Sequence, residues 1–322
     1  MSQHLIIDNK NIQLKLEGKA LNILYPDRKP ASIPLRMLEQ VTLLANIEIP
    51  VHLLHKLAQH GISISVINPR NQNTVTTCLN HQHLDYARRE QQYALMHDRN
   101  LCRQASSELV QAKLLSQIQL LQRLAHRRPQ FKAEAQHAEK AIHNLLPSVH
   151  NMPRSQLLGL EGSAARIYFQ AYGSFFNSKW NFNGRNKRPP KDPVNALLSL
   201  GYTMLLREVD QTLQRVGLDP AFGFYHKTSH GRSSLACDLL ELYRTQIDLF
   251  VYQLLAEQVL KPEHFAYQLN ACLLTKEGRS RFFPAYQKAM QPCRRALRLT
   301  ALHWVQRLLA TPKPHWMTDE VA

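Results

Sequence analysis

The sequence predicts an α+β protein in which a small N-terminal β-sheet domain is followed by a larger, all-α-helical domain. Two observations support this fold class. Over roughly the first eighty residues, short runs alternate apolar with polar residues, which is the periodicity of strands. From about Leu84 that alternation stops, and apolar residues recur three and four positions apart, as on one face of a helix. We therefore expect a sheet domain over residues 1–82 and a helical domain over residues 83–322.

The expected strands of the first domain are separated by residues that favour turns, namely Asn, Asp, Gly and Pro. These strands are HLIID, IQLKLEG, ALNILYP, ISISVINP and TVTTCL. One helix interrupts them at PVHLLHKLAQHG, where Pro50 suits the first helical turn and Gly61 suits the end.

The second domain is predicted to be helical because its long segments keep apolar residues on one face. The first clear example is ELVQAKLLSQIQLLQRL. The later helices are SQLLGLEGSAARIYFQAYGSFF, PVNALLSLGYTMLLREVDQTLQRVG, SSLACDLLELYRTQIDLFVYQLLAEQVL and a last one from about Pro284 to Leu309.

The charge of the chain indicates a polyanionic partner. Lys and Arg number 40 against 24 Asp and Glu, so the formal net charge is +16 and the pI is near 9.8. Self-repulsion of this size does not help folding, so nucleic acid is the first candidate partner and an anionic membrane the second. No apolar run approaches the ~20 residues of a spanning helix, and the N-terminus does not resemble a signal peptide. Five scattered cysteines without a CxxC pair indicate a reducing cytoplasm.

Two segments of the helical half carry polar groups among apolar ones. In LLGLEGSAARIYF, Glu161 is surrounded by apolar residues and lies either on a solvated face or in a buried site. In FNGRNKRPPKDPVNALLSLGYTML, a basic, Pro-rich loop opens onto a helix that starts at Asp192-Pro193. Such a loop can hold a phosphate at the helix N-terminus, or it can be a mobile surface loop.

A third segment, GFYHKTSHGRSSLACDLLELYR, combines two histidines with an acidic helix. Asp238 and Glu241 are three residues apart, so both carboxylates project from nearly the same helix face. A histidine and acids from separate elements suit a cation of the Mg²⁺ or Mn²⁺ type. Zinc is the rival because His226 and His230 are four apart, but this stretch reads as a loop and HExxH is absent. His226 follows the apolar run AFGFY and is the better supported ligand, whereas His230 lies between Ser229 and Gly231.

Together these three segments resemble the CRISPR adaptation integrase, the universal CRISPR-associated endonuclease that inserts new spacers. The resemblance extends over roughly residues 155–250 at motif level. It implies a small N-terminal β-domain, a helical catalytic domain and a homodimer formed largely through the β-domains. It also implies a cytoplasmic, prokaryotic complex in which two dimers flank a dimer of a small ferredoxin-like adaptation protein on double-stranded DNA.

Carried over residue by residue, the resemblance implies that Glu161, His226 and Glu241 are the metal-binding, catalytic residues. Asp238 is the nearest alternative ligand. Two departures from the common pattern, Cys237 in place of an aliphatic residue and LLELYR without a second acid after the Glu, remove no ligand.

The implied reaction is transesterification, in which the 3′-hydroxyl of a short duplex attacks a phosphodiester at the edge of a CRISPR repeat and displaces another 3′-hydroxyl. With water as the nucleophile, the same site would act as a nuclease. The bases expected to bind DNA are Arg185, Arg188, Lys191, Arg244, Arg279 and Arg281.

Alternative functions are a non-catalytic DNA-binding scaffold and a transposon-type integrase of the same fold. Such integrases usually carry an extra C-terminal DNA-binding segment, for which the tail after Leu309 leaves no room. A catalytic domain excised from a reverse-transcriptase fusion is a further possibility.

Overall fold

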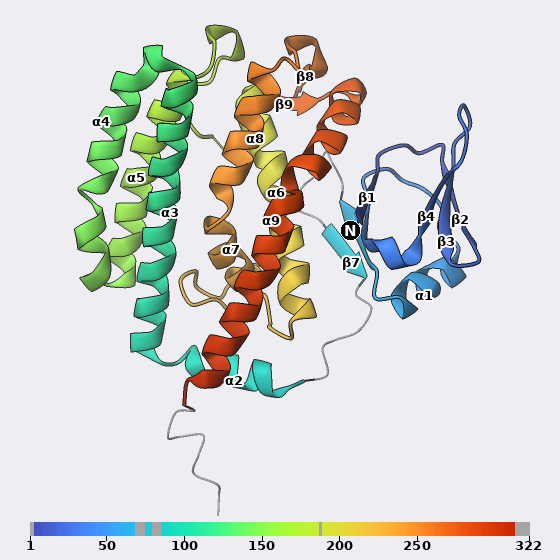
Figure 1. The fold of residues 1–322 in the computed structure, drawn as a ribbon, viewed down its shortest axis with the longest axis horizontal. Coiled ribbons are helices and arrows are strands. Elements are labelled where there is room, and N and C mark those ends of the chain that lie inside the picture. Colours follow the sequence, from blue (N-terminus) through green and yellow to red (C-terminus); the bar gives the residue numbers. More distant parts are fainter. Residues whose placement is uncertain (1–2, 68–74, 79–84, 187–188, 313–322) are drawn as a thin grey trace, which may run out of the picture. The chain divides into compact units, whose positions relative to one another are not determined.

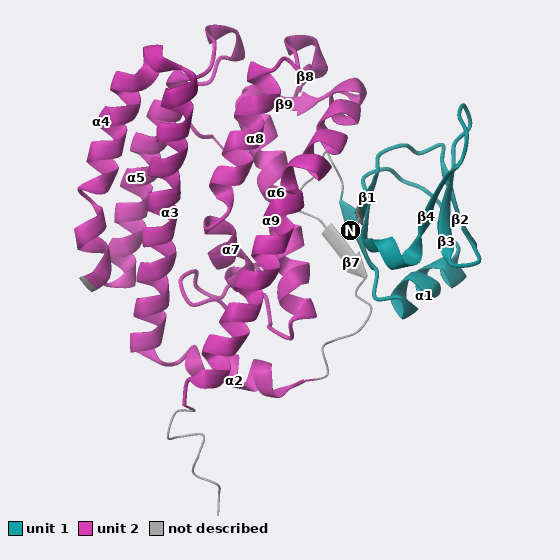
Figure 2. Cartoon of the chain, in the orientation of Figure 1, with its two compact units in different colours: residues 1–84 teal, residues 85–322 magenta. Residues whose placement is uncertain are grey.

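The computed structural model describes residues 3–67, 75–78, 85–186 and 189–312. The chain divides into two compact units, Met1–Leu84 and Asp85–Ala322 (Figure 2). The predicted fold class is confirmed, because the first unit is a small β-sheet region and the second is mostly helical (Figure 1).

The first unit contains two sheets. A three-stranded antiparallel sheet has the order β2-β3-β4, and a four-stranded sheet has the order β1-β5-β6-β7, with only β7 antiparallel to its neighbour. The strands are β1 (Gln3–Ile7), β2 (Gln13–Glu17), β3 (Ala20–Leu24), β4 (Ala31–Pro34), β5 (Leu38–Leu43), β6 (Ser63–Ile67) and β7 (Val75–Cys78).

Helix α1 (Val51–Gln59) connects β5 to β6 and closes the core of this unit. Its buried face carries Leu53 and Leu57, which belong to the same apolar cluster as Leu21 and Ile64 from the two sheets. Pro50 is the N-cap, and Gly61 follows the helix with a φ of +70°, a conformation that glycine adopts without strain. The predicted helix and the five predicted strands are therefore confirmed.

Strands β4 and β5 were not predicted. The inner strand β5 pairs with parallel strands on both sides, and five of its six residues are buried, so it lacks the alternation that marks a half-exposed strand. The short strand β4 lies at the edge of its sheet and ends at Pro34, a residue usually read as a strand breaker.

The second unit is a helical assembly built around the long helices α3, α6 and α9 (Figure 1). Its helices are α2 (Ala87–Leu95), α3 (Arg99–Arg127), α4 (Lys132–His143), α5 (Arg154–Ser174), α6 (Pro193–Arg215), α7 (Ser234–Glu241), α8 (Arg244–Ala256) and α9 (Lys276–Ala310). No helix in the described part of the chain is sufficiently long and apolar to span a membrane.

One predicted helix is divided in two. The apolar pattern from Ser233 to Leu260 predicted a continuous helix, but α7 ends at Glu241 and α8 begins at Arg244. Tyr243, between them, has a φ of −117° and a ψ of 0°, outside the helical range. The break places Glu241 at the end of one helix and lets Arg244 turn back towards it.

The helical unit also contains a β-hairpin, which the sequence analysis did not predict. Strands β8 (Phe265–Gln268) and β9 (Ala271–Leu274) are antiparallel and are joined by Leu269 and Asn270. Both turn residues have positive φ values, 47° and 63°, as a type I′ turn requires. Leucine is an unusual residue for such a turn, so the local sequence gave little indication of a β-hairpin. Helix α9 starts after this hairpin at Lys276, earlier than predicted, and continues through Pro284 and Pro292.

Candidate active site

One cleft in the helical unit brings together five of the residues that the sequence analysis selected. It has a volume of about 840 Å³, and α3, α5, α6, α7 and α8 all contribute to its lining. The predicted site residues that line it are Glu161, Arg185, His226, Glu241 and Arg244. The three predicted metal ligands therefore share one cleft, although they come from different elements of the chain.

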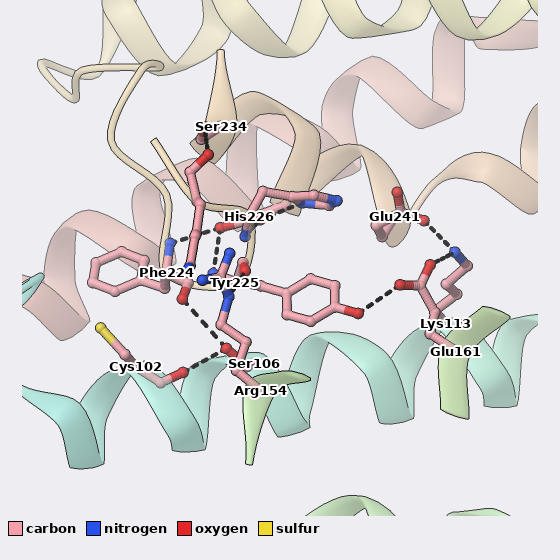
Figure 3. A network of polar contacts seen from close by, with 12 residues as sticks. Cys102, Ser106, Lys113, Arg154, Glu161, Phe224, Tyr225, His226, Ser234 and Glu241 are labelled. Carbon is pink, nitrogen blue, oxygen red and sulfur yellow. Dashed lines mark hydrogen bonds and ion pairs between the residues drawn. The ribbon is translucent and has the colours of Figure 1, made fainter. Parts of the chain in front are cut away.

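The two predicted acidic ligands meet at a single ammonium group (Figure 3). Lys113, on α3, contacts Glu161 Oε1 and lies 2.5 Å from Glu241 Oε2. The other oxygen of Glu161 accepts a 2.5 Å hydrogen bond from the Tyr225 hydroxyl. The side chains of Glu161 and Glu241 are 17% and 4% exposed, so neither acid lies on a solvated face. This part of the cleft concentrates negative charge that a cation has to balance.

His226 is held by Asp238, the acid that the sequence analysis gave as the alternative ligand. Asp238 Oδ1 lies 2.7 Å from His226 Nδ1 and accepts the His226 backbone N–H at 2.8 Å. Asp238 Oδ2 accepts the backbone N–H groups of Phe224 and Tyr225 at 2.7 and 2.9 Å. With a carboxylate as the acceptor, Nδ1 carries the ring proton and Nε2 keeps its lone pair. Asp238 therefore orients His226, and Glu241 fits the role of third ligand better.

Glycine is required where this loop passes the acidic helix. A Cβ atom on Gly223 would lie 2.7 Å from Asp238 Oδ2 and 2.7 Å from the carbonyl carbon of Ser234. Both distances are shorter than any van der Waals contact, so a larger residue would displace the carboxylate that fixes His226. The GFYH stretch is thus shaped by packing against α7.

His230 differs from His226 in its surroundings. It is exposed, whereas the His226 side chain is 12% exposed and lines the cleft. Within the described residues, no group of three or more His, Cys, Asp or Glu side chains is arranged to hold a metal ion, and this applies to the three predicted ligands as it does to the His226–His230 pair. The assignment of Glu161, His226 and Glu241 as metal ligands therefore stays a prediction.

The donor set nevertheless fits a divalent cation. Two carboxylates and one imidazole are the ligand types that Mg²⁺ and Mn²⁺ accept, with the nitrogen favouring Mn²⁺. The position between the carboxylates of Glu161 and Glu241 already accommodates the positively charged end of Lys113.

Glu241 is kept ionised by its neighbours. Arg244 Nε donates to Glu241 Oε2 at 2.8 Å. Burial alone would raise the pKa of Glu241, but the charges of Arg244 and Lys113 lower that pKa to about 2. A carboxylate with so low a pKa is anionic at neutral pH and available to a cation.

A second buried acid, Asp248, lies farther along α8 and also lines the cleft. It accepts hydrogen bonds from the hydroxyls of Tyr202 and, at 2.7 Å, Tyr168. Burial raises the pKa of Asp248 to about 6, against the opposing effect of the two hydroxyls. The guanidinium of Arg244 lies 4.7 Å from the Tyr202 ring centre and that of Arg185 5.5 Å from it, so this end of the cleft carries two cations.

The sequence analysis missed several residues that shape the cleft, namely Lys113, Tyr202, Tyr225 and Asp248. A signal was available for Lys113. It lies four residues from Leu109 and from Gln117 on the buried side of α3, where a lysine is unusual. Tyr202 and Asp248 lie in helices and Tyr225 lies in the loop before α7, and the roles of all three depend on contacts between distant segments.

Only some of the basic residues predicted to bind DNA line the cleft. Arg185 lines the cleft, and its guanidinium donates to Asn195 Oδ1 at 2.7 Å and Ser199 Oγ at 3.1 Å, which holds the basic loop onto α6. Lys191 is exposed just before the Asp192 N-cap of α6.

The remaining bases lie elsewhere. Arg279 donates to the Leu274 carbonyl at 3.0 Å, and Arg281 pairs with Glu277 at 2.9 Å on the first turns of α9. Arg188 lies outside the described residues. The exposed residues Arg166 and Arg232 also line the cleft and add two cations to it.

Known proteins match this chain over most of its length. The family model for the CRISPR associated protein Cas1 matches residues 5–288. The CRISPR-associated endonuclease Cas1 1 of Thermodesulfovibrio yellowstonii is 35% identical over 311 residues, which cover 94% of this chain and 96% of that protein.

Two solved structures share the fold. A casposase bound to its integration product has a TM-score of 0.83 at 18% identity and covers 97% of this chain and 92% of its own. A chain of a Cas6-RT-Cas1–Cas2 complex has a TM-score of 0.80 at 25% identity and covers 96% of this chain and 35% of its own. Since both the family model and a full-length relative extend over nearly the whole sequence, the chain belongs to the CRISPR associated protein Cas1 family.

Proposed function

We propose that this protein is a metal-dependent DNA integrase and endonuclease of CRISPR adaptation, which inserts new spacers by 3′-hydroxyl transesterification. The observation that carries the proposal is the meeting of two carboxylates at one cationic group, in a cleft that His226 also lines. Relatives named as CRISPR-associated endonucleases support the nuclease and integrase class.

Glu161, Glu241 and the Nε2 atom of His226 would hold Mg²⁺ or Mn²⁺. When bound, the cation supplies Lewis-acid stabilisation of charge on the phosphate under attack. Asp238 accepts a hydrogen bond from the Nδ1 proton, which would leave the lone pair of Nε2 available to a cation. Tyr225 fixes the second oxygen of Glu161 and thus limits the ways in which that carboxylate can turn.

The cations of the same cleft are suited to the DNA backbone. Arg185 and Arg244 lie beside Tyr202, and Arg166 and Arg232 are exposed at the cleft surface. Guanidinium groups bind phosphate oxygens without reading the bases, which orients a duplex across the site. Two duplex segments bound in this way would place the attacking 3′-hydroxyl in line with the leaving oxygen.

The proposed partners are double-stranded DNA, a second copy of this chain and a dimer of a small ferredoxin-like adaptation protein. Structures with a similar fold support the first and third, because one is a casposase bound to an integration product and another is a complex with Cas2. The +16 charge agrees with a DNA partner.

The testing experiment is strand joining between a short duplex with free 3′-hydroxyl ends and a plasmid that carries a CRISPR repeat. We expect joining with Mg²⁺ or Mn²⁺, more with the adaptation protein present, and none in EDTA. Glu161→Gln should abolish joining while DNA affinity stays within about twofold, since the basic surface is unchanged. Glu263→Gln, at an exposed acid outside the cleft, is the matched control. Undiminished joining in EDTA would refute the metal-dependent mechanism.

A further inference from the structure

We infer that Lys113 is an internal substitute for the divalent cation: its ammonium holds Glu161 and Glu241 together in the metal-free protein and is displaced when the metal binds. The inference rests on the proposed function and assigns a role to a residue that touches both predicted acidic ligands. Lys113 is thus a positioning residue, which keeps the site assembled between metal-bound states.

The contacts of Lys113 join three separate helices. Its side chain, on α3, is 8% exposed and contacts Glu161 on α5 and Glu241 at the end of α7. Figure 3 draws the ammonium between the two carboxylates. Without a cation at this point, two largely buried acids would face each other, and their repulsion would separate the helices or leave one acid protonated.

The same position cannot hold both cations. A divalent ion that binds Glu161 and Glu241 takes the oxygens that Lys113 contacts, and two positive charges a few ångströms apart repel strongly in a buried site. Lysine is suited to leave, because its ammonium is a point charge on a flexible four-carbon chain. Arg244 also contacts Glu241 Oε2, and its guanidinium is held over the Tyr202 ring, so it is the less mobile of the two cations.

The inference predicts that a neutral residue at position 113 strengthens metal binding and weakens the metal-free fold. Lys113→Met keeps the length and apolar character of the side chain without its charge. In EDTA its Tm should be lower than that of the wild type by about 5 °C, because two acids lose their shared partner. Mn²⁺ should bind Lys113→Met at least tenfold more tightly and raise its Tm by more than it raises that of the wild type.

Binding is measured with MnCl₂ alone, by electron paramagnetic resonance of free Mn²⁺ and by thermal shift, on the full chain without DNA. Lys113→Gln serves as a second neutral variant should Lys113→Met fail to fold, and Lys113→Arg keeps the charge and should bind Mn²⁺ no more tightly than the wild type. Lys132→Met, at an exposed lysine on α4, is the matched control and should behave as the wild type.

The outcomes separate the two claims. If the wild type binds Mn²⁺ and the folded neutral variants bind it with equal or lower affinity, the role of Lys113 is refuted while the proposed metal site stands. If neither the wild type nor the neutral variants bind Mn²⁺, the metal-dependent function and the role of Lys113 are both refuted.

Discussion

Two buried acids on either side of one helix break have pKa values that shift in opposite directions. Glu241 ends α7, and its pKa is lowered to about 2, whereas Asp248 lies on α8, and its pKa is raised to about 6. The two residues are 3% and 1% exposed, so burial penalises both charges. Their partners make the difference, because Glu241 has two cations within hydrogen-bonding distance and Asp248 is hydrogen-bonded by tyrosine hydroxyls.

The comparison assigns different tasks to the two ends of the cleft. The end around Glu241 keeps its negative charge at neutral pH and is the proposed place of the divalent cation. The end around Asp248 is a support in which Tyr168, Tyr172 and Tyr202 join α5 and α6 to α8 through hydrogen bonds. Substitutions of the proposed ligands at the first end should therefore affect chemistry, and substitutions at the second end should affect the dependence of stability on pH.

The largest expected effect is at the first end. His226→Ala should reduce Mn²⁺-dependent strand joining by at least about a hundredfold, because a positioned ligand of the reacting centre is lost. His230→Ala should cost at most a few-fold, because His230 is exposed in the same loop. Both variants are compared in one joining assay after circular dichroism confirms that they are folded. An active His226→Ala protein beside an inactive His230→Ala protein would reverse the assignment.

A smaller effect is expected when pH changes the free energy of unfolding through Asp248, at the second end of the cleft. The pKa of Asp248 is about 6 in the folded protein against a usual value of 3.8, so between these values the folded state binds the proton more tightly than the unfolded chain. The contribution of Asp248 to stability should therefore fall as pH rises, by about 3 kcal/mol in total from below pH 3.8 to above pH 6, at 1.36 kcal/mol per pKa unit.

Asp248→Asn removes this titration. The unfolding free energy of the wild type minus that of the variant, measured in urea at several pH values, should decrease from about pH 3 to about pH 7 and then stay constant. A difference that does not change with pH would show that Asp248 has an ordinary pKa, and the contrast with Glu241 would disappear.

The smallest expected effect concerns DNA binding by Lys191, the exposed lysine just before α6. Lys191→Ala should weaken duplex binding and reduce the slope of log affinity against log salt by about 0.9, the value for one phosphate contact. Arg281→Ala should change the slope less, because that guanidinium is already paired with Glu277. Fluorescence anisotropy from 50 to 300 mM salt measures both variants, and equal slopes for Lys191→Ala and wild type would exclude the contact.

The fold was predictable from the sequence wherever periodicity was plain. Short alternating runs identified β1, β2, β3, β6 and β7, and 3.6-residue periodicity identified the long helices. The buried strand β5 and the break between α7 and α8 were missed for different reasons. The strand, LEQVTL, does not alternate apolar with polar residues, and its polar residues Gln40 and Thr42 are buried. At the break, apolar residues recur at helical spacing on both sides, so the pattern does not indicate where α7 ends.

The site was partly predictable. The sequence motifs selected Glu161, His226 and Glu241, and the structure brings all three to one cleft. The division of roles between Asp238 and Glu241 required the structure, because helical spacing places both on one face and only the packing of the GFYH loop against α7 separates them. Lys113 was not selected, since its partners come from helices that are distant in sequence.

The central claim is that Glu161, His226 and Glu241 together hold a divalent cation in this cleft. Anomalous diffraction at the manganese edge, from crystals of the full chain grown with Mn²⁺, tests it directly. The account predicts one strong peak between the two carboxylates and within coordinating distance of His226 Nε2, with the Lys113 ammonium moved away from both acids. A peak elsewhere, or no peak with the ammonium still between Glu161 and Glu241, would contradict it.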